Sequence, residues 1–130
     1  MPFASLSDIK MYYHLIGNFK NKKNTLVFLH GGAGIADHTL YVPFWSTFAD
    51  LVNIVFLDQR GCGKTERGDQ NKWNLTQNGI DVFSFCEALS INKPIVAGVS
   101  WGGYATISYA TQFTPPRSIN PLQHRSRTIA

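Results

Sequence analysis

The stretch from Val96 to Gly103 constrains the fold of this chain more than any other. It is a short apolar run followed by Ser100, with Gly98 two positions before the serine and Gly102 two positions after it. A strand that turns sharply into a helix forces its corner residue into a strained backbone conformation. The residues two positions away must then be small, because the backbones crowd together there. The pattern predicts a strand that ends near Ser100 and a helix that begins directly after it.

The surroundings of the serine fit this prediction. Residues 95–97 form an apolar run typical of a buried strand, and residues 104–113 are typical of a helix. Such a corner holds the Ser100 hydroxyl clear of the sheet, next to the N–H groups that open the helix, and these favour a developing negative charge. Ser100 is therefore a candidate nucleophile. The alternative is an ordinary strand–turn–helix without chemistry.

Further strands are predicted upstream. Continuous apolar runs at 25–29 and 54–57 are typical of buried strands, and each is followed by a glycine-containing turn. Before them, residues 3–6 and 9–16 carry branched and aromatic residues that predict a hairpin across Ser7 and Asp8.

Two segments between the strands have the apolar spacing of helices. Residues 44–52 follow Pro43, which suits a first helical position, and residues 76–89 carry an apolar stripe with Thr76 as a candidate N-cap. Strands that alternate with helices indicate an α/β fold. We expect a mostly parallel sheet with right-handed crossovers and an N-terminal antiparallel hairpin.

In such a sheet, functional residues belong at the carboxyl ends of the strands, where the turns 30–34 and 58–63 and Ser100 all lie. A glycine-rich turn suits an oxyanion hole or a phosphate site. The phosphate-binding loop is disfavoured because its first glycine is missing, and the dinucleotide fingerprint fails at Asp37 and Glu66. We therefore expect no cofactor and no metal.

Composition excludes several other classes. The chain has 130 residues, of which 44% are hydrophobic, as in one globular domain. No apolar run approaches the roughly 18 residues of a membrane span, and no secretory signal is visible at the N-terminus. Cys62 and Cys86 lack metal-binding spacing and suit reduced, cytoplasmic thiols. The net charge of +4 arises mainly from arginines after position 113, so no basic face for nucleic acid is predicted.

Three motifs, in this order and spacing, resemble the α/β-hydrolase superfamily and, within it, the proline iminopeptidase-like branch. They are His30-Gly31-Gly32-Ala33-Gly34, Asp58-Gln59-Arg60-Gly61-Cys62-Gly63-Lys64-Thr65 and Gly98-Val99-Ser100-Trp101-Gly102-Gly103. The resemblance covers residues 3–113, the N-terminal half of such a domain.

The resemblance implies a serine hydrolase that acts on small ester, amide or peptide substrates, with aminopeptidase-like activity. Ser100 is then the nucleophile. The N–H of Trp101 and one from Gly32 or Ala33 form the oxyanion hole. The glycines flanking the serine shape what is called the nucleophile elbow. In this family Asp58 is expected to brace the neighbouring loop together with Arg60, and not to act as the triad acid.

The chain departs from the family after the serine. In this fold the triad acid and histidine follow the nucleophile, but no Asp or Glu follows Ser100 and the single later histidine is His124. We therefore expect an incomplete and inactive chain. The alternative function is a non-catalytic binding or interaction module derived from a hydrolase.

The last residues carry a further expectation. Residues 1–113 are predicted to be the N-terminal part of the hydrolase domain, and residues 114–130 a disordered tail outside the family, because prolines in it block a helix. A sheet cut at this point leaves the strand 95–99 with an open apolar edge. A partner that covers this edge is then expected.

Overall fold

A computed structural model describes residues 2–32, 34–113 and 127–129. These residues form one sheet with the strand order β1-β2-β4-β3-β5-β6. The strands are β1 Phe3–Ser5, β2 Lys10–Ile16, β3 Thr25–Leu29, β4 Asn53–Leu57, β5 Ile95–Gly98 and β6 Arg127–Ile129. β1 and β2 pair antiparallel, as do β2 and β4, and the other pairs are parallel. The predicted fold class, a mostly parallel sheet with an N-terminal antiparallel hairpin, is confirmed.

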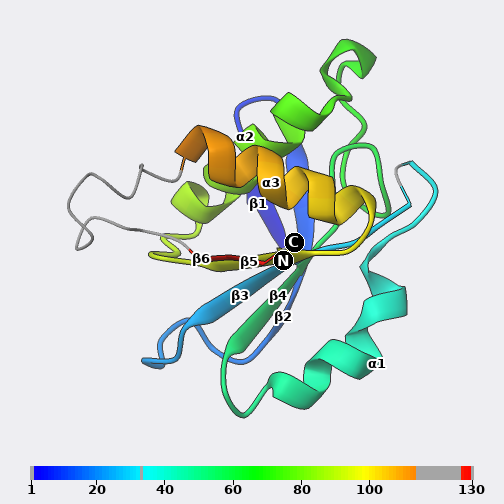
Figure 1. Cartoon of the computed structure of the whole chain (residues 1–130). Helices are drawn as coiled ribbons and strands as arrows, with labels where there is room; N and C mark the ends of the chain where they lie inside the picture. The colour runs from blue at the N-terminus through cyan, green and yellow to red at the C-terminus, as the bar shows by residue number, and fades with distance from the viewer. Residues whose placement is uncertain (1, 33, 114–126, 130) are drawn as a thin grey trace.

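Helices cover both faces of this sheet. The helical elements are η1 His38–Tyr41, α1 Val42–Trp45, η2 Ser46–Phe48, η3 Gln70–Lys72, α2 Leu75–Ala88 and α3 Trp101–Phe113. Figure 1 shows α2 and α3 side by side on one face of the sheet and α1 on the opposite face.

The central strands β3 and β4 are buried along their whole length, and their side chains alternate between two apolar clusters. The cluster shared with α2 and α3 contains Val27, Leu29, Val55 and Leu57. The cluster shared with the segment from η1 to η2 contains Leu26, Phe28, Ile54 and Phe56. This two-sided burial explains why these strands appear in the sequence as continuous apolar runs. It also fixes the carboxyl ends of the strands, where the candidate site lies.

The helix expected over residues 44–52 is replaced by one short α-helical turn between two 3₁₀ turns. Side-chain hydroxyls in this segment bond to the preceding turn: Ser46 Oγ donates to the Val42 carbonyl at 2.5 Å, and Thr47 Oγ1 to the Phe44 carbonyl at 2.7 Å. Such bonds slightly destabilise a regular helix and often bend it. Pro43 lies in the first turn of α1, as predicted.

The N-cap of α2 is Asn74, and Thr76 lies inside the helix. Asn74 has an extended backbone, and its Oδ1 accepts from the Gln77 main-chain N–H at 2.8 Å. An amide at this position satisfies one of the free donors of the first turn. The expectation that Thr76 caps the helix was therefore wrong by two positions.

The parallel strand β6 lies beside β5, with Val96 opposite Thr128. At residues 127–129 the chain is thus a strand, where we expected a disordered tail. The edge of β5, expected to be open, is paired over these residues because unpaired strand groups favour a hydrogen-bonding neighbour. The remainder of the predicted tail, 114–126 and 130, lies outside the described residues.

Candidate active site

Ser100 lies at the corner between β5 and α3 with a φ of +55°. This left-handed conformation is uncommon for a residue with a side chain. It persists only where the surrounding structure imposes it. The strand, the sharp corner and the helix predicted around Ser100 are all present, and the Ser100 side chain is exposed.

The glycines on either side of the serine lie where no side chain fits. A Cβ on Gly98 would overlap the main-chain carbonyl of Gly102, and a Cβ on Gly102 would overlap the carbonyl of Leu29 at the end of β3. The backbones of β5, α3 and β3 therefore approach one another directly. This close approach produces the strained corner at Ser100.

The turn that follows β3 lies against the serine. A Cβ built on Gly31 would be 3.0 Å from the Val99 carbonyl oxygen and 3.1 Å from Ser100 Cβ. The next residue, Gly32, has a φ of +67°, and its carbonyl accepts from the N–H groups of Ile35 and Ala36 at 3.0 Å each. The sheet thus brings Gly31 next to the serine, and the predicted Gly32 follows it directly in the same turn. Ala33, the alternative donor, lies outside the described residues.

This juxtaposition follows from the strand order. β3 and β5 are neighbours, and the chain leaves β3 toward α1 on one face but leaves β5 toward α3 on the other (Figure 1). Ligands bind at such switch points, outside the carboxyl ends of the strands. Trp101 opens α3, and the first N–H groups of a helix have no acceptor within it. The Gly102 N–H donates instead to the Val99 carbonyl at 2.9 Å, so the candidate donor for an anion beside Ser100 is the predicted N–H of Trp101.

His30, directly after β3, is completely buried and engaged at both ring nitrogens. Nδ1 lies 2.7 Å from the Gly31 carbonyl oxygen, and Nε2 accepts from the Gln59 main-chain N–H at 3.0 Å. These partners assign the neutral ring with its proton on Nδ1. Burial lowers the pKa of His30, which favours the same neutral form. His30 therefore joins two turns and is not available to Ser100 as a base.

Asp58, the first residue after β4, is also fully buried. Its Oδ1 accepts from the main-chain N–H of His38 at 2.9 Å and lies 2.7 Å from His38 Nδ1, and its Oδ2 accepts from the Lys64 N–H at 3.1 Å. Asp58 thus ties its own turn to the start of η1. This geometry agrees with the bracing role expected of it.

Residues 24–122 match the model of a family described as the alpha/beta hydrolase fold. The chain belongs to the α/β-hydrolase fold family. The match runs beyond Phe113, where we expected the resemblance to end. Within the family, the predicted proline iminopeptidase-like branch is confirmed by curated relatives of that name.

Two of these relatives are the proline iminopeptidases of Clostridium botulinum and Neisseria gonorrhoeae. The first is 28% identical over 116 residues, covering 88% of this chain and 38% of the relative. The second is 35% identical over 101 residues, covering 75% of this chain and 30% of the relative. This α/β-hydrolase chain therefore spans well under half the length of the curated relatives it matches.

Solved structures agree on the fold. The proline iminopeptidase of Mycobacterium smegmatis superposes with a TM-score of 0.72 at 25% identity, covering 85% of this chain and 39% of that one. The enol-lactonase of Burkholderia xenovorans LB400 gives a TM-score of 0.77 at 20% identity, covering 86% and 42%, and this likeness concerns the fold alone.

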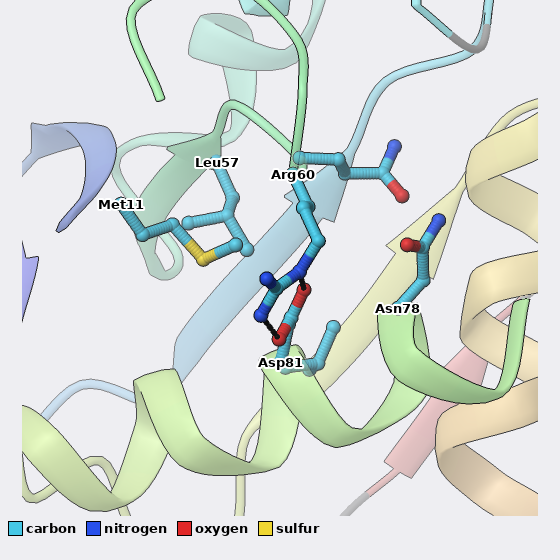
Figure 2. A pocket seen from close by; sticks show the side chains of 7 residues that line it. Met11, Leu57, Arg60, Asn78 and Asp81 are labelled. Carbon is cyan, nitrogen blue, oxygen red and sulfur yellow. Dashed lines mark hydrogen bonds and ion pairs between the residues drawn. The ribbon is translucent and has the colours of Figure 1, made fainter. Parts of the chain in front are cut away.

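Arg60, in the turn after β4, binds two carboxylates. It donates to Asp81 on α2 at 2.9 and 2.8 Å and to Asp8 at 2.7 and 3.0 Å. Hydrogen bonds from Arg60 lower the pKa of Asp8 to about 2. Figure 2 shows the Arg60 guanidinium facing Asp81, and the apolar side chains of Met11 and Leu57 line the same space. The space among these side chains has no room for a water molecule.

Sequence reasoning missed the partners of these residues. The sequence predicts a turn at Asp8 and no contact for Asp81 or His38. The arginine and the aspartate of the second motif were the available signal, since buried charges require partners. The motif did not indicate which residues those partners are.

No histidine in the described part of the chain is hydrogen-bonded to Ser100. His30 and His38 are engaged as above, and His14 stacks on His38 with ring centroids 5.9 Å apart. His124 lies outside the described residues. The same residues contain no group of three or more His, Cys, Asp or Glu placed to hold a metal ion. Among the described helices, none is both long enough and apolar enough for a membrane span.

Proposed function

We propose that this chain carries the nucleophile and the oxyanion hole of a serine hydrolase that cleaves small ester, amide or peptide substrates, with aminopeptidase-like activity. The observation that carries the proposal is the strained backbone of Ser100, which is exposed at the corner between β5 and α3 and lies next to Gly31. The relatives named proline iminopeptidase support the aminopeptidase-like part.

In this proposal Ser100 Oγ attacks the carbonyl carbon of the substrate, and the carbonyl oxygen becomes an oxyanion. The main-chain N–H of Trp101, together with that of Gly32 or Ala33, donates to this oxygen. Donors held in place before the reaction stabilise the transition state without reorganisation. When this tetrahedral intermediate collapses, its bond to the leaving group breaks, the leaving group takes up the serine proton, and an acyl-serine remains, which water then hydrolyses.

The hydroxyl proton of Ser100 requires a base, because serine is a weak nucleophile without one. The histidines of the described residues are engaged elsewhere. We therefore propose that the 130-residue chain alone reacts slowly. Loss of a triad member leaves only the residual catalysis of the oxyanion hole and substrate binding.

The test is covalent labelling of the chain with a fluorophosphonate probe, followed by intact-mass analysis, with Ser100→Ala as the matched control. We expect labelling at Ser100 on the order of 10⁴-fold slower than for a complete proline iminopeptidase. Added imidazole should accelerate it, because a soluble base replaces the missing one. The acceleration must be absent in Ser100→Ala.

Equal labelling of the parent chain and Ser100→Ala would contradict the proposal. So would a parent chain that stays unlabelled with imidazole while the complete enzyme reacts. Either outcome would favour the alternative, a non-catalytic binding module derived from a hydrolase.

We also propose a cytoplasmic location. Cys62 and Cys86 are free and buried, and burial raises the pKa of Cys86 to about 12. Unpaired structural thiols suit a reducing compartment. Fractionation of cells that express the tagged chain tests this, and recovery outside the cytoplasm would contradict it.

A further inference from the structure

Asn78 of α2 contacts the residue that follows the nucleophile. Its side chain is 6% exposed. One orientation of its amide satisfies both polar atoms: Oδ1 accepts from the Trp101 indole Nε1–H at 2.8 Å, and Nδ2 donates to the Asn74 carbonyl at 3.2 Å. In the opposite orientation the amide NH₂ would face the indole N–H of Trp101, and the amide oxygen would face the carbonyl oxygen of Asn74. The hydrogen-bond network therefore assigns the first.

Asn78 is itself held by the helix on which it lies. One turn before it, the N-cap Asn74 accepts from the Gln77 N–H. Three positions after it, Asp81 is bound by Arg60 at 2.9 and 2.8 Å. Residues three apart lie on the same side of a helix, and Arg60, Asn78 and Asp81 line one tightly filled space (Figure 2). Asn78 thus lies beside the Arg60–Asp81 pair, which joins α2 to the turn after β4.

Trp101 connects Asn78 to the proposed site. It is the first residue of α3, so its main-chain N–H points out of the open end of the helix. Its indole, on the same residue, is bound to α2 through Asn78. A first-turn residue held at its side chain has less freedom to rotate or fray than one held by its backbone alone.

We propose that Asn78 is a positioning residue, which fixes the main-chain N–H of Trp101 for the oxyanion through the indole of the same residue. The catalytic consequence rests on the proposed function. The positioning of the Trp101 N–H does not rest on that function, so the positioning and the proposed function can be disproved separately.

Positioning is tested by proton–nitrogen NMR on the ¹⁵N-labelled chain. Asn78→Leu keeps the size of the side chain but removes the acceptor. Asn78→Asp keeps an oxygen at the same place, and Gln77→Ala serves as a control because Gln77 bonds to Asp81 and not to Trp101. Trp101→Phe identifies the indole signal of Trp101.

We expect Asn78→Leu to shift the Trp101 indole signal and to speed its exchange with solvent about tenfold, the loss of one hydrogen bond. The main-chain amide signal of Trp101 should shift as well. Asn78→Asp should restore both signals toward the parent positions. Gln77→Ala should leave both unchanged, and the indole signals of Trp45 and Trp73 should stay in place throughout.

The second readout is the fluorophosphonate labelling rate, which should fall about tenfold in Asn78→Leu and in Trp101→Phe. The double variant should be no slower than either single one, because both remove the same contact. If the parent chain is not labelled at all, the proposed function fails and the NMR signals alone decide the positioning.

An unchanged Trp101 main-chain amide signal in Asn78→Leu, whatever the indole does, would overturn the proposal. If Asn78→Leu fails to fold, Trp101→Phe decides instead, since it leaves Asn78 intact. In that variant the readout is the solvent exchange of the position-101 amide relative to the intrinsic rate of a phenylalanine amide, and protection equal to that in the parent chain would overturn the proposal equally.

Discussion

Arg60 donates two hydrogen bonds to Asp81, 2.9 Å from Nε to Oδ2 and 2.8 Å from Nη2 to Oδ1 (Figure 2). The pair joins the turn after β4 to α2 in a space that excludes water. Two-pronged contacts of this kind combine charge with fixed geometry. Because both groups are buried away from water, the charge of each is compensated by the other.

Replacement of Arg60 by alanine should destabilise the fold strongly, because Asp81 would be left buried without its cation. We expect a loss of about 3–5 kcal/mol in the free energy of unfolding, measured by urea titration. Lys72→Ala is the matched control: Lys72 lies 3.4 Å from Asp8 but is exposed. A surface pair of this kind contributes at most about 1 kcal/mol. Equal losses in the two variants would contradict this account.

Stability should fall in acid through Asp8. Its pKa is lowered from 3.8 to about 2 by the hydrogen bonds and charge of Arg60. A lowered pKa in the folded state means that the folded carboxylate binds its proton less readily than the unfolded one. Its stabilising contribution is therefore present above pH 3.8 and lost as the pH falls toward 2.

Asp8→Asn removes this titration. We expect the variant to be less stable than the parent chain at neutral pH, and its unfolding free energy to change less between pH 4 and 2. Urea titrations at several pH values measure both effects. Parallel pH profiles for the two proteins would show that Asp8 does not contribute.

Gly102 and Gly103 should respond in opposite ways to alanine. A Cβ on Gly102 would overlap the Leu29 carbonyl, whereas a Cβ on Gly103 would find the Gly98 carbonyl oxygen at an ordinary 3.6 Å. We expect Gly102→Ala to cost about 3 kcal/mol or more. Gly103→Ala, inside α3, should be neutral or stabilise by up to about 1 kcal/mol.

Thermal and urea unfolding of the two variants check this difference, and they also examine the origin of the strain at Ser100. If Gly102→Ala were as stable as Gly103→Ala, the direct backbone approach between β3 and α3 would not be required for the corner.

Much of the local structure was predictable because it depends on neighbours in the sequence. The strand expected at 25–29 is β3, and the strand expected at 54–57 is β4 with Asn53 added. Both are apolar runs that only a two-sided sheet can bury. The helix expected after Pro43 is irregular, and in this segment the Ser46 hydroxyl bonds to the Val42 carbonyl, a contact that often bends a helix.

By itself, the sequence determined the strands up to Gly98, the two long helices, their order and the strained corner at Ser100, because spacing, apolar runs and small residues act over a few positions. The tertiary structure alone decided which residues meet. Arg60 finds Asp8 across 52 positions, and Gly31 reaches Ser100 because β3 and β5 are neighbours in the sheet. Such pairs follow from how strands and helices pack in space. The sequence around one residue of a pair does not indicate which residue is its partner.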